Sequence, residues 1–314
     1  PHDATNCNIL IHGDLLYVNT SNGVHRIPGE ADPRPDAPTL IVLDKKTGKL
    51  VAQDGCLIGR RMFHGNWSSP SLGKVAGKEQ IFLGGGDGFL YAFSPVKPDP
   101  KAKKPAVFKS IWKFDCNPAS YKVDKNGDKL DFWDGDASRA DVPHNYKGPN
   151  SIIATPVCYK NRVYLAVGRD PEHGIGRGML HCIDATKTGD VTKTASIWSY
   201  DKIARTISTV AIADGLVYIC DYAGLIHCLD AETGKLYWIH NTRERIWNSA
   251  LVADGKVYVG TEKKNLFIFK TGRKKQLIAT IKMPYKMSTT PIVSGGCIYI
   301  PTARALYSVG KTKP

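Results

Sequence analysis

The sequence has no long hydrophobic run. Its 314 residues include no stretch of about 18 consecutive apolar side chains, so we expect no transmembrane helix. It also begins without a methionine and without the charged and apolar regions of a signal peptide, from which we expect a processed or trimmed fragment.

The eight cysteines form none of the short motifs that carry cysteine chemistry. C-x-x-C and C-x-x-C-H are both missing, which argues against a zinc ribbon, a thioredoxin-like redox site and attached haem. An even number would permit disulfides in an oxidising compartment, but the spacing predicts no pairing. Most cysteines fall in strand-like segments, so we expect them to act as small buried hydrophobic residues.

Acidic residues are scarce. There are 29 Asp and Glu against 43 Lys and Arg, which gives a formal charge of +14. Such an excess either attracts an acidic partner or surface, or serves only solubility. The basic segments are not interleaved with aromatic residues of the kind that stack on bases, so we expect no specific nucleic-acid partner.

What the sequence does contain is a repeated four-strand pattern, clearest from Thr206 to Asn241. Four short runs there alternate apolar and polar residues, and turns such as Asp214-Gly215 and Thr233-Gly234 separate them. Alternating runs of about 4–8 residues with these turns predict an antiparallel meander. One such sheet has two apolar faces and needs neighbouring sheets to cover them.

Copies of this pattern run along the whole chain. The second strand recurs as a hydrophobic-Tyr-hydrophobic triplet, and its Tyr218 and Tyr258 lie 40 residues apart. A four-stranded unit that repeats every 40–50 residues or so is typical of a β-propeller blade. We therefore predict a single all-β domain over residues 1–314, with six antiparallel blades, in preference to a β-sandwich. The expected blades span 6–55, 67–115, 152–201, 206–241, 248–282 and 288–310, with long inserts at 20–39, 116–151 and 169–178.

The repeat resembles that of the pyrroloquinoline-quinone-like (PQQ-like) propeller family. The resemblance rests on Ala213 to Cys220 followed by Leu225 to Trp238, and on a second copy from Ala253 to Gly260. This family includes quinone-dependent dehydrogenases and a propeller lipoprotein of the outer-membrane β-barrel assembly machinery that binds no cofactor. The longer inserts resemble those of uncharacterised bacterial members of planctomycete type. The resemblance implies a periplasmic or other extracytoplasmic location in a bacterium.

The sixth unit shows three strands and no fourth. Six blades with a weak closure and a fragment of a seven- or eight-bladed ring both fit this pattern, and the family resemblance favours the fragment. Among the core positions, we expect Val18, Val163, Val217, Val293 and Ile300 to be buried.

Strand parity places the long connections on one face. In a four-stranded meander, the loops between the second and third strands lie on the same face as those between successive blades. Four extended loops of the first three blades fall there: Thr20–Thr39, Gly55–Asn66, Cys116–Ser151 and Arg169–Gly178. We call this side the insert face. Long loops on a rigid scaffold are common binding sites, so we predict that this face binds the partner.

Nine residues of these loops are the candidates for contact. They are Arg60, Arg61, His64, Trp67, Asp136, His144, Asp170, His173 and Arg177. Arginine and tryptophan suit a docking surface for a protein or glycan. The histidines and aspartates would suit a metal or acid–base site. Ordinary anchoring of the loops by salt bridges is the third interpretation.

Two glycine- or aspartate-rich stretches have simpler explanations than ligand binding. Gly84 to Gly88 is followed by a strand and lacks the Lys-Ser/Thr of a phosphate loop, so it predicts a hairpin turn. Asp124 to Asp128 is followed by Lys129 where a calcium loop has glycine, so it predicts a β-turn. The opposite face carries most of the basic charge, including Lys101 and Lys103, and predicts contact with an anionic surface.

These patterns favour a non-catalytic scaffold that binds a ligand or protein on the insert face. The alternatives are a quinone-dependent oxidoreductase and a hydrolase or lyase that uses the insert face. The dehydrogenases of the resembling family use an adjacent cysteine pair and a calcium held by acidic and amide side chains. This sequence has no Cys-Cys pair and no recognisable calcium set, so we expect no PQQ, calcium or other cofactor.

Overall fold

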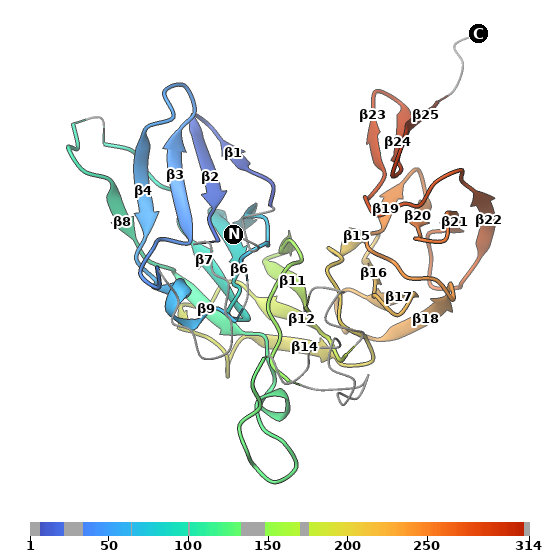
Figure 1. The fold of residues 1–314 in the computed structure, drawn as a ribbon, viewed down its shortest axis with the longest axis horizontal. Helices are drawn as coiled ribbons and strands as arrows, with labels where there is room; N and C mark the ends of the chain where they lie inside the picture. Colours follow the sequence, from blue (N-terminus) through green and yellow to red (C-terminus); the bar gives the residue numbers. More distant parts are fainter. Residues whose placement is uncertain are drawn as a thin grey trace.

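The computed structural model describes residues 7–21, 34–63, 65–99, 101–132, 148–169 and 176–310. Its described residues form six sheets, each built on an antiparallel meander, that follow one another in an arc, with the first and last sheets at its two ends (Figure 1). The prediction of an all-β propeller is confirmed. Short 3-10 helices, η1 (Ile58–Arg61) and η2 (Ala119–Tyr121), occur in two connections. No helix of the described chain is long and apolar enough to cross a membrane.

Each sheet keeps the order of its strands along the chain, as a meander requires. Blade one contains β1 (Leu10–His12), β2 (Leu15–Asn19), β3 (Leu40–Asp44) and β4 (Leu50–Asp54). Blade two contains β5 (Ser71–Val75), β6 (Lys78–Gly84), β7 (Phe89–Phe93) and β9 (Trp112–Asp115). Blade three contains β10 (Val157–Tyr159), β11 (Arg162–Val167), β12 (Met179–Asp184) and β14 (Ser196–Tyr200). Blade four contains β15 (Ala211–Ala213), β16 (Leu216–Cys220), β17 (Leu225–Asp230) and β18 (Leu236–Asn241); blade five contains β19 (Leu251–Ala253), β20 (Lys256–Gly260), β21 (Asn265–Lys270) and β22 (Leu277–Lys282); blade six contains β23 (Ile292–Ser294), β24 (Cys297–Pro301) and β25 (Leu306–Gly310).

Two blades carry a fifth strand that the repeat did not predict. The connection after β7 supplies β8 (Ala106–Phe108), which pairs in parallel with β4 of the preceding blade. The connection after β12 supplies β13 (Gly189–Asp190), which pairs in parallel with β9 in the same way. A parallel partner from another blade leaves no tight turn in the sequence, so local patterns gave no signal for it.

Hydroxyl groups at the inner strands join one blade to the next. The backbone N–H of Asn8 donates to Ser69 Oγ at 3.0 Å, and that of Thr155 donates to Thr209 Oγ1 at 3.1 Å. Thr209 N–H donates in turn to Ser249 Oγ, and Ser249 N–H to Thr290 Oγ1, both at 2.9 Å. All six residues stand two positions before the first strand of their blade. We call this series of contacts the hydroxyl ladder.

Tryptophans of the outer strands make a second set of contacts between blades. Trp198 Nε1 donates to the carbonyl of Ala231 at 3.1 Å, and Trp238 Nε1 donates to that of Gly272 at 3.0 Å. The Trp198 ring lies so close to Gly234 that an added Cβ would come within 2.7 Å of it. Gly234 also has a φ of +71°, so the Thr-Gly turn of the repeat needs glycine for both reasons.

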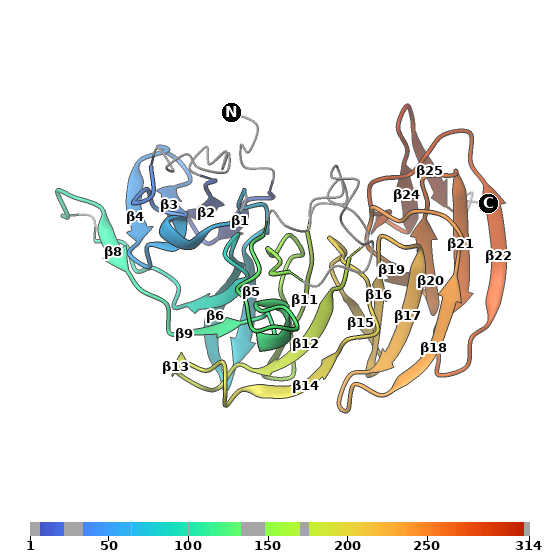
Figure 2. The same ribbon diagram turned by 60° about the horizontal axis from the view of Figure 1, so that its bottom comes forward.

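The core lies between successive blades, and its position corrects two predictions. Val163, Val217 and Ile300 are buried as expected, but Val18 is only half-buried and Val293 is 49 % exposed. Both belong to end blades, which have a neighbour on one side only among the described residues (Figure 2). The three strands predicted for blade six are confirmed. No disulfide joins cysteines of the described residues, and the cysteines of β12, β16 and β17 are buried.

We expect the hydroxyl ladder to contribute measurably to stability. Replacing Thr209 by Val would leave the N–H of Thr155 without its acceptor, at a cost of about 1–3 kcal/mol in unfolding free energy. Thr209→Ser keeps the hydroxyl and should recover most of that loss. Chemical denaturation of both variants measures the difference, and equal stabilities would contradict the role of the hydroxyl.

A buried histidine predicts a pH dependence of stability. His181 of β12 contacts the carbonyl of Cys116 through Nε2 at 2.8 Å and the hydroxyl of Ser199 through Nδ1 at 3.1 Å. Burial lowers the pKa of His181 from 6.5 to about 4, so the folded protein keeps the ring neutral where the unfolded chain protonates it. The stabilisation is therefore full above pH 6.5 and is lost as the pH falls towards 4.

Between these two pH values, unfolding free energy should fall by about 1.4 kcal/mol per pH unit from this group. Denaturation curves recorded at several pH values should show a shallower fall in His181→Gln than in the unmodified chain. Parallel curves for the two proteins would show that another group controls the acid response.

Candidate functional site

The structure describes four of the nine predicted contact residues. Arg60, Arg61, Trp67 and Arg177 can be placed, whereas His64, Asp136, His144, Asp170 and His173 lie outside the described residues. The metal or acid–base interpretation rested on that second group and stays a prediction. Among the residues that can be placed, no group of three or more His, Cys, Asp or Glu side chains is arranged to hold a metal ion.

Arg61 is 41 % exposed, and its guanidinium contacts two buried residues, Asp87 in the turn between β6 and β7 and Tyr91 in β7. Its Nε donates to Asp87 Oδ2 at 3.2 Å, and its Nη2 donates to the Tyr91 hydroxyl at 2.8 Å. Tyr91 donates in turn to Asp87 Oδ2 at 2.6 Å. Burial raises the pKa of the Asp87 carboxyl, and the contacts with Tyr91 and Arg61 oppose that rise. Burial, followed by the charge of Asp87, also raises the pKa of Tyr91.

The adjacent Arg60 lies in a different environment. It pairs with Asp36, and both side chains are more than half exposed, at 55 % and 62 %. Arg61 therefore fastens η1 to blade two, whereas Arg60 is on the surface and accessible to a partner. The sequence predicts Arg61 as a contact residue because it lies in a long loop. It does not show that Asp87, in the glycine-rich turn, is buried and forms an ion pair with Arg61. That turn is the predicted hairpin, with Gly88 N–H donating to the carbonyl of Gly85 at 3.0 Å.

The two arginines should respond differently to truncation. Arg61→Ala removes the positive charge beside the buried Asp87, which keeps only its hydrogen bonds from Tyr91 and Phe89, and we expect a loss of about 1–3 kcal/mol in unfolding free energy. Arg60→Ala removes only an exposed ion pair, and its denaturation midpoint should match that of the unmodified chain. Equal losses in the two variants would contradict the structural role of Arg61.

Trp67 and Arg177 lie where the insert face predicted them. Trp67 is half-buried in the connection before β5, and Trp247 occupies the equivalent position before β19. The Arg177 side chain is exposed, while its backbone carbonyl accepts a hydrogen bond from Asn150 Nδ2 at 3.2 Å. The structure thus leaves Arg60 and Arg177 exposed, Trp67 partly so, and Arg61 engaged.

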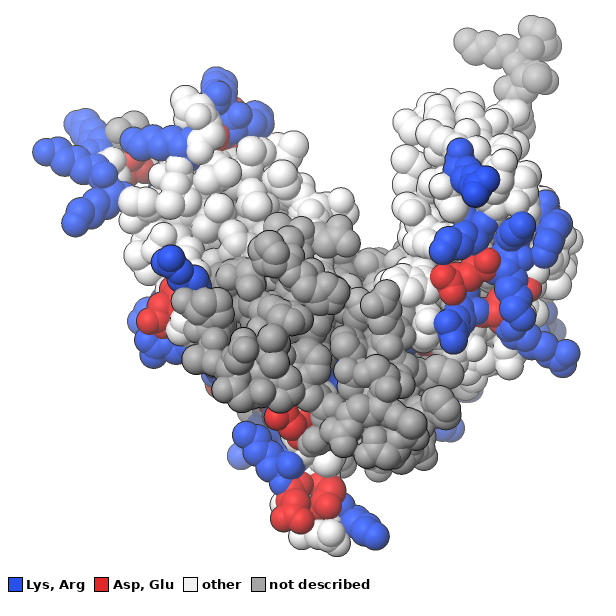
Figure 3. All heavy atoms as spheres, in the orientation of Figure 1, with Lys and Arg blue, Asp and Glu red and all other residues white. Residues whose placement is uncertain are grey.

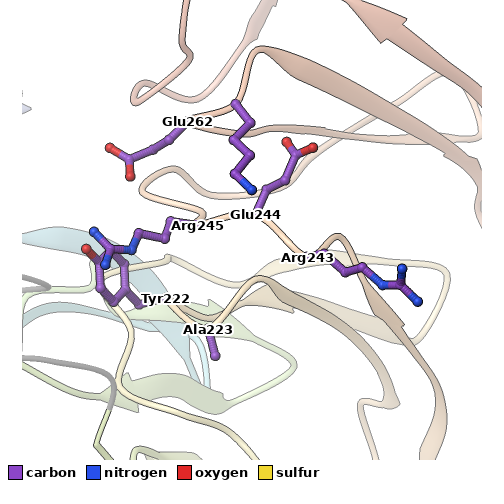
Figure 4. Close-up of a pocket in the computed structure, with 7 residues that line it drawn as sticks. Tyr222, Ala223, Arg243, Glu244, Arg245 and Glu262 are labelled. Atoms are coloured by element: carbon purple, nitrogen blue, oxygen red, sulfur yellow. The ribbon is translucent and has the colours of Figure 1, made fainter. Parts of the chain in front are cut away.

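An open pocket of about 410 Å³ lies on the same face, between blades four and five. It is lined by Tyr222, Ala223, Arg243, Glu244, Arg245, Glu262 and Lys263 (Figure 4). These residues come from the turns between the second and third strands of the two blades and from the connection between β18 and β19. Strand parity therefore puts the pocket on the insert face, at compact turns that loop length alone does not single out.

Contacts within the pocket hold several of its side chains in place. The carboxylate of Glu244 accepts hydrogen bonds from Thr261 and Asn265. The Arg245 guanidinium lies over the ring of Tyr222, at 5.3 Å from its centroid. Tyr222 packs edge to face on Trp247, with 5.8 Å between the ring centroids. The pocket wall thus contains one fixed carboxylate, Glu244, and one fixed aromatic ring, Tyr222, which Trp247 contacts edge to face.

Exposed basic side chains surround this pocket. Arg243 and Arg245 stand on one wall and Lys263 on another, with Arg304 on the neighbouring turn of blade six. In Figure 3 basic side chains gather over β19 to β22, with a few acidic ones between them. The opposite face is predicted to carry most of the basic charge, and these side chains form a smaller basic group in addition to it. The signal was present in the Arg-Glu-Arg run at 243–245 and the Lys pair at 263–264, since parity places both on the insert face.

Comparisons with known proteins agree with this architecture. A family model described as outer membrane protein assembly factor BamB matches residues 176–305. The chain has a β-propeller fold, and over residues 176–305 it is similar to this family. The crystal structure of BamB from Moraxella catarrhalis superposes on it with a TM-score of 0.61, 15 % identity, and coverage of 96 % of this chain and 70 % of that one. At this identity the likeness shows the fold alone. No curated protein sequence matches the chain.

Proposed function

We propose that this PQQ-like propeller is a non-catalytic scaffold that binds a partner protein on its insert face, outside the cytoplasm. The observation that carries the proposal is the pocket between blades four and five, whose lining combines three basic residues, two acidic residues and Tyr222. Support for a protein partner and for the location comes from the matched family, which is named for an outer membrane protein assembly factor. Arg60, Trp67 and Arg177 would extend the contact surface towards blades one to three.

The chemistry of the pocket favours an acidic segment of the partner. Arginine binds carboxylates through two parallel hydrogen bonds, and Lys263 adds a further positive charge at the opening. Tyr222 and Trp247 offer aromatic surface beside these cations. A neutral glycan would use the aromatic surface but not the excess of three cations over the two carboxylates, Glu244 and Glu262, in the pocket lining, so we propose a protein ligand.

The rigidity of the pocket supports binding as well. Its side chains stand on short turns of a sheet scaffold, and Glu244 and Arg245 are already held by neighbouring groups. A preformed site loses less conformational entropy when it binds than a mobile one does. The fixed carboxylate of Glu244 also repels acidic groups that enter in another orientation, which adds selectivity.

Charge reversal at matched positions tests this proposal. The first variant carries Arg243→Glu, Arg245→Glu and Lys263→Glu; the control carries Arg273→Glu, Lys274→Glu and Lys275→Glu on the opposite face, with the same change in net charge. Binding of a fluorescent peptide rich in Asp, Glu and Tyr is followed by anisotropy at two salt concentrations. We expect the pocket variant to weaken binding at least about tenfold and the control to change it little.

An equal loss in both variants would mean that the peptide senses only net charge, which would contradict a site. The same control variant tests the predicted contact of the opposite face with an anionic surface. Sedimentation with vesicles that contain an anionic phospholipid should fall for the control and not for the pocket variant.

A further inference from the structure

The connections between blades carry a basic residue at one repeated position. It stands four residues before the residue of the hydroxyl ladder, as Arg205 before blade four, Arg245 before blade five and Lys286 before blade six. At all three positions the backbone carbonyl accepts an N–H from the turn between the second and third strands of the blade that follows. The donors are Tyr222, Glu262 and Ala303, at 3.2, 3.1 and 2.9 Å. The three basic residues therefore occupy equivalent places on the insert face of successive blades.

In blades five and six the turn adds a second basic residue to the first. The residue after the donor is Lys263 in blade five and Arg304 in blade six, where blade four has Ala223. The same backbone bond ties each turn to its connection, so Lys263 is placed relative to Arg245 as Arg304 is placed relative to Lys286. Each of these two blades thus presents two basic residues together, which we call a basic pair.

The side chains of both basic pairs are exposed. Those of blade five are exposed although that blade packs against a neighbour on each side, so a free end of the arc is not what exposes them. One arginine of each pair lies over an aromatic ring, Arg245 over Tyr222 at 5.3 Å from its centroid and Arg304 over Tyr285 at 5.8 Å. Cations held over rings lose less conformational entropy when a ligand binds.

The charge around the two pairs favours an acidic ligand. The connections and turns of blades five and six, residues 242–248, 261–264, 283–289 and 302–305, contain six Lys and Arg but two Asp and Glu. One of these two carboxylates, that of Glu244, already accepts hydrogen bonds from Thr261 and Asn265. An excess of positive charge remains for a partner of the opposite sign.

The distance between neighbouring blades limits the form of such a ligand. Sheets that pack face to face lie about 10 Å apart. In a polyproline II segment, residues three positions apart point to the same side and are about 9 Å apart. In a β-strand, residues on one side are two or four positions apart, which is about 7 or 13 Å. The polyproline II conformation therefore matches the spacing of the blades, whereas a strand does not.

We propose that the basic pairs of blades five and six bind an acidic segment of the partner protein in polyproline II conformation, with two acidic residues three positions apart. This inference rests on the proposed function and defines the chemical form of its ligand. One acidic side chain binds Arg245 and Lys263, and the other binds Lys286 and Arg304. Such a segment has a solvated backbone and needs no strand to pair with, which suits a surface made of turns.

Peptides that differ only in spacing test the proposal on the full chain. Each carries two glutamates, placed two, three or four positions apart among prolines and glutamines, so that composition and net charge are constant. Anisotropy of a fluorescent label measures binding at low salt. We expect the peptide with glutamates three positions apart to bind at least about tenfold more tightly than the other two. A maximum at two or four positions would indicate a strand and overturn the proposal, and so would equal binding of all three peptides.

Two variants with the same loss of charge locate the second anchor. Lys286→Gln combined with Arg304→Gln should abolish the preference for three positions and leave the weaker binding through the pocket. Arg273→Gln combined with Lys274→Gln changes exposed residues of the opposite face and should keep the preference. A preference that survives in the first variant would show that blade six supplies no anchor, and would contradict the proposal.

Failure of this inference can be told apart from failure of the proposed function. If no peptide binds, or if charge reversal in the pocket leaves binding unchanged, the acidic ligand itself is wrong and both proposals are overturned. If charge reversal abolishes binding but the unmodified chain binds the three peptides equally, the proposed function stands and this inference alone is wrong.

Discussion

A single type of contact sets the geometry of the arc. Each joint of the hydroxyl ladder places a side-chain oxygen of one blade on a backbone N–H of the blade before it. Blades two and three are joined in a related way, with the Ser68 and Ser71 hydroxyls donating to carbonyls of Ala154 and Pro156. These contacts fix the distance between inner strands, and the tryptophans and core side chains then fill the wider space further out. The turns that form the pocket between blades four and five inherit their positions from this spacing.

Much of this fold could be predicted because its signals are local. Tyrosines such as Tyr218 and turns such as Asp214-Gly215 each lie within one hairpin, so a short window of sequence contains the whole pattern. The parallel strands β8 and β13 could not be predicted, since their partners are in other blades and no turn connects them. The wrong assignment of Val293 has a similar cause, because burial depends on a neighbouring blade and not on the strand itself.

The candidate site was predicted less well, for a physical reason. Strand parity assigned Arg60 and Arg177 to the insert face, and both side chains are exposed there. Side-chain type could not distinguish Arg61, whose partner Asp87 is buried, from Arg60, whose partner Asp36 is exposed. Loop length could not predict the pocket, because its walls come from three short connections of ordinary length. Such a site exists only after two blades are placed side by side, and loop length is no guide to it.

The ladder has a consequence for how such a molecule can change over time. Because each joint uses the same short bond between neighbours, a blade is added or removed without altering the joints that remain. None of these contacts determines the number of blades. A gene can therefore duplicate such blades as complete units. A binding surface formed by one pair of blades, such as the pocket, is then duplicated together with that pair.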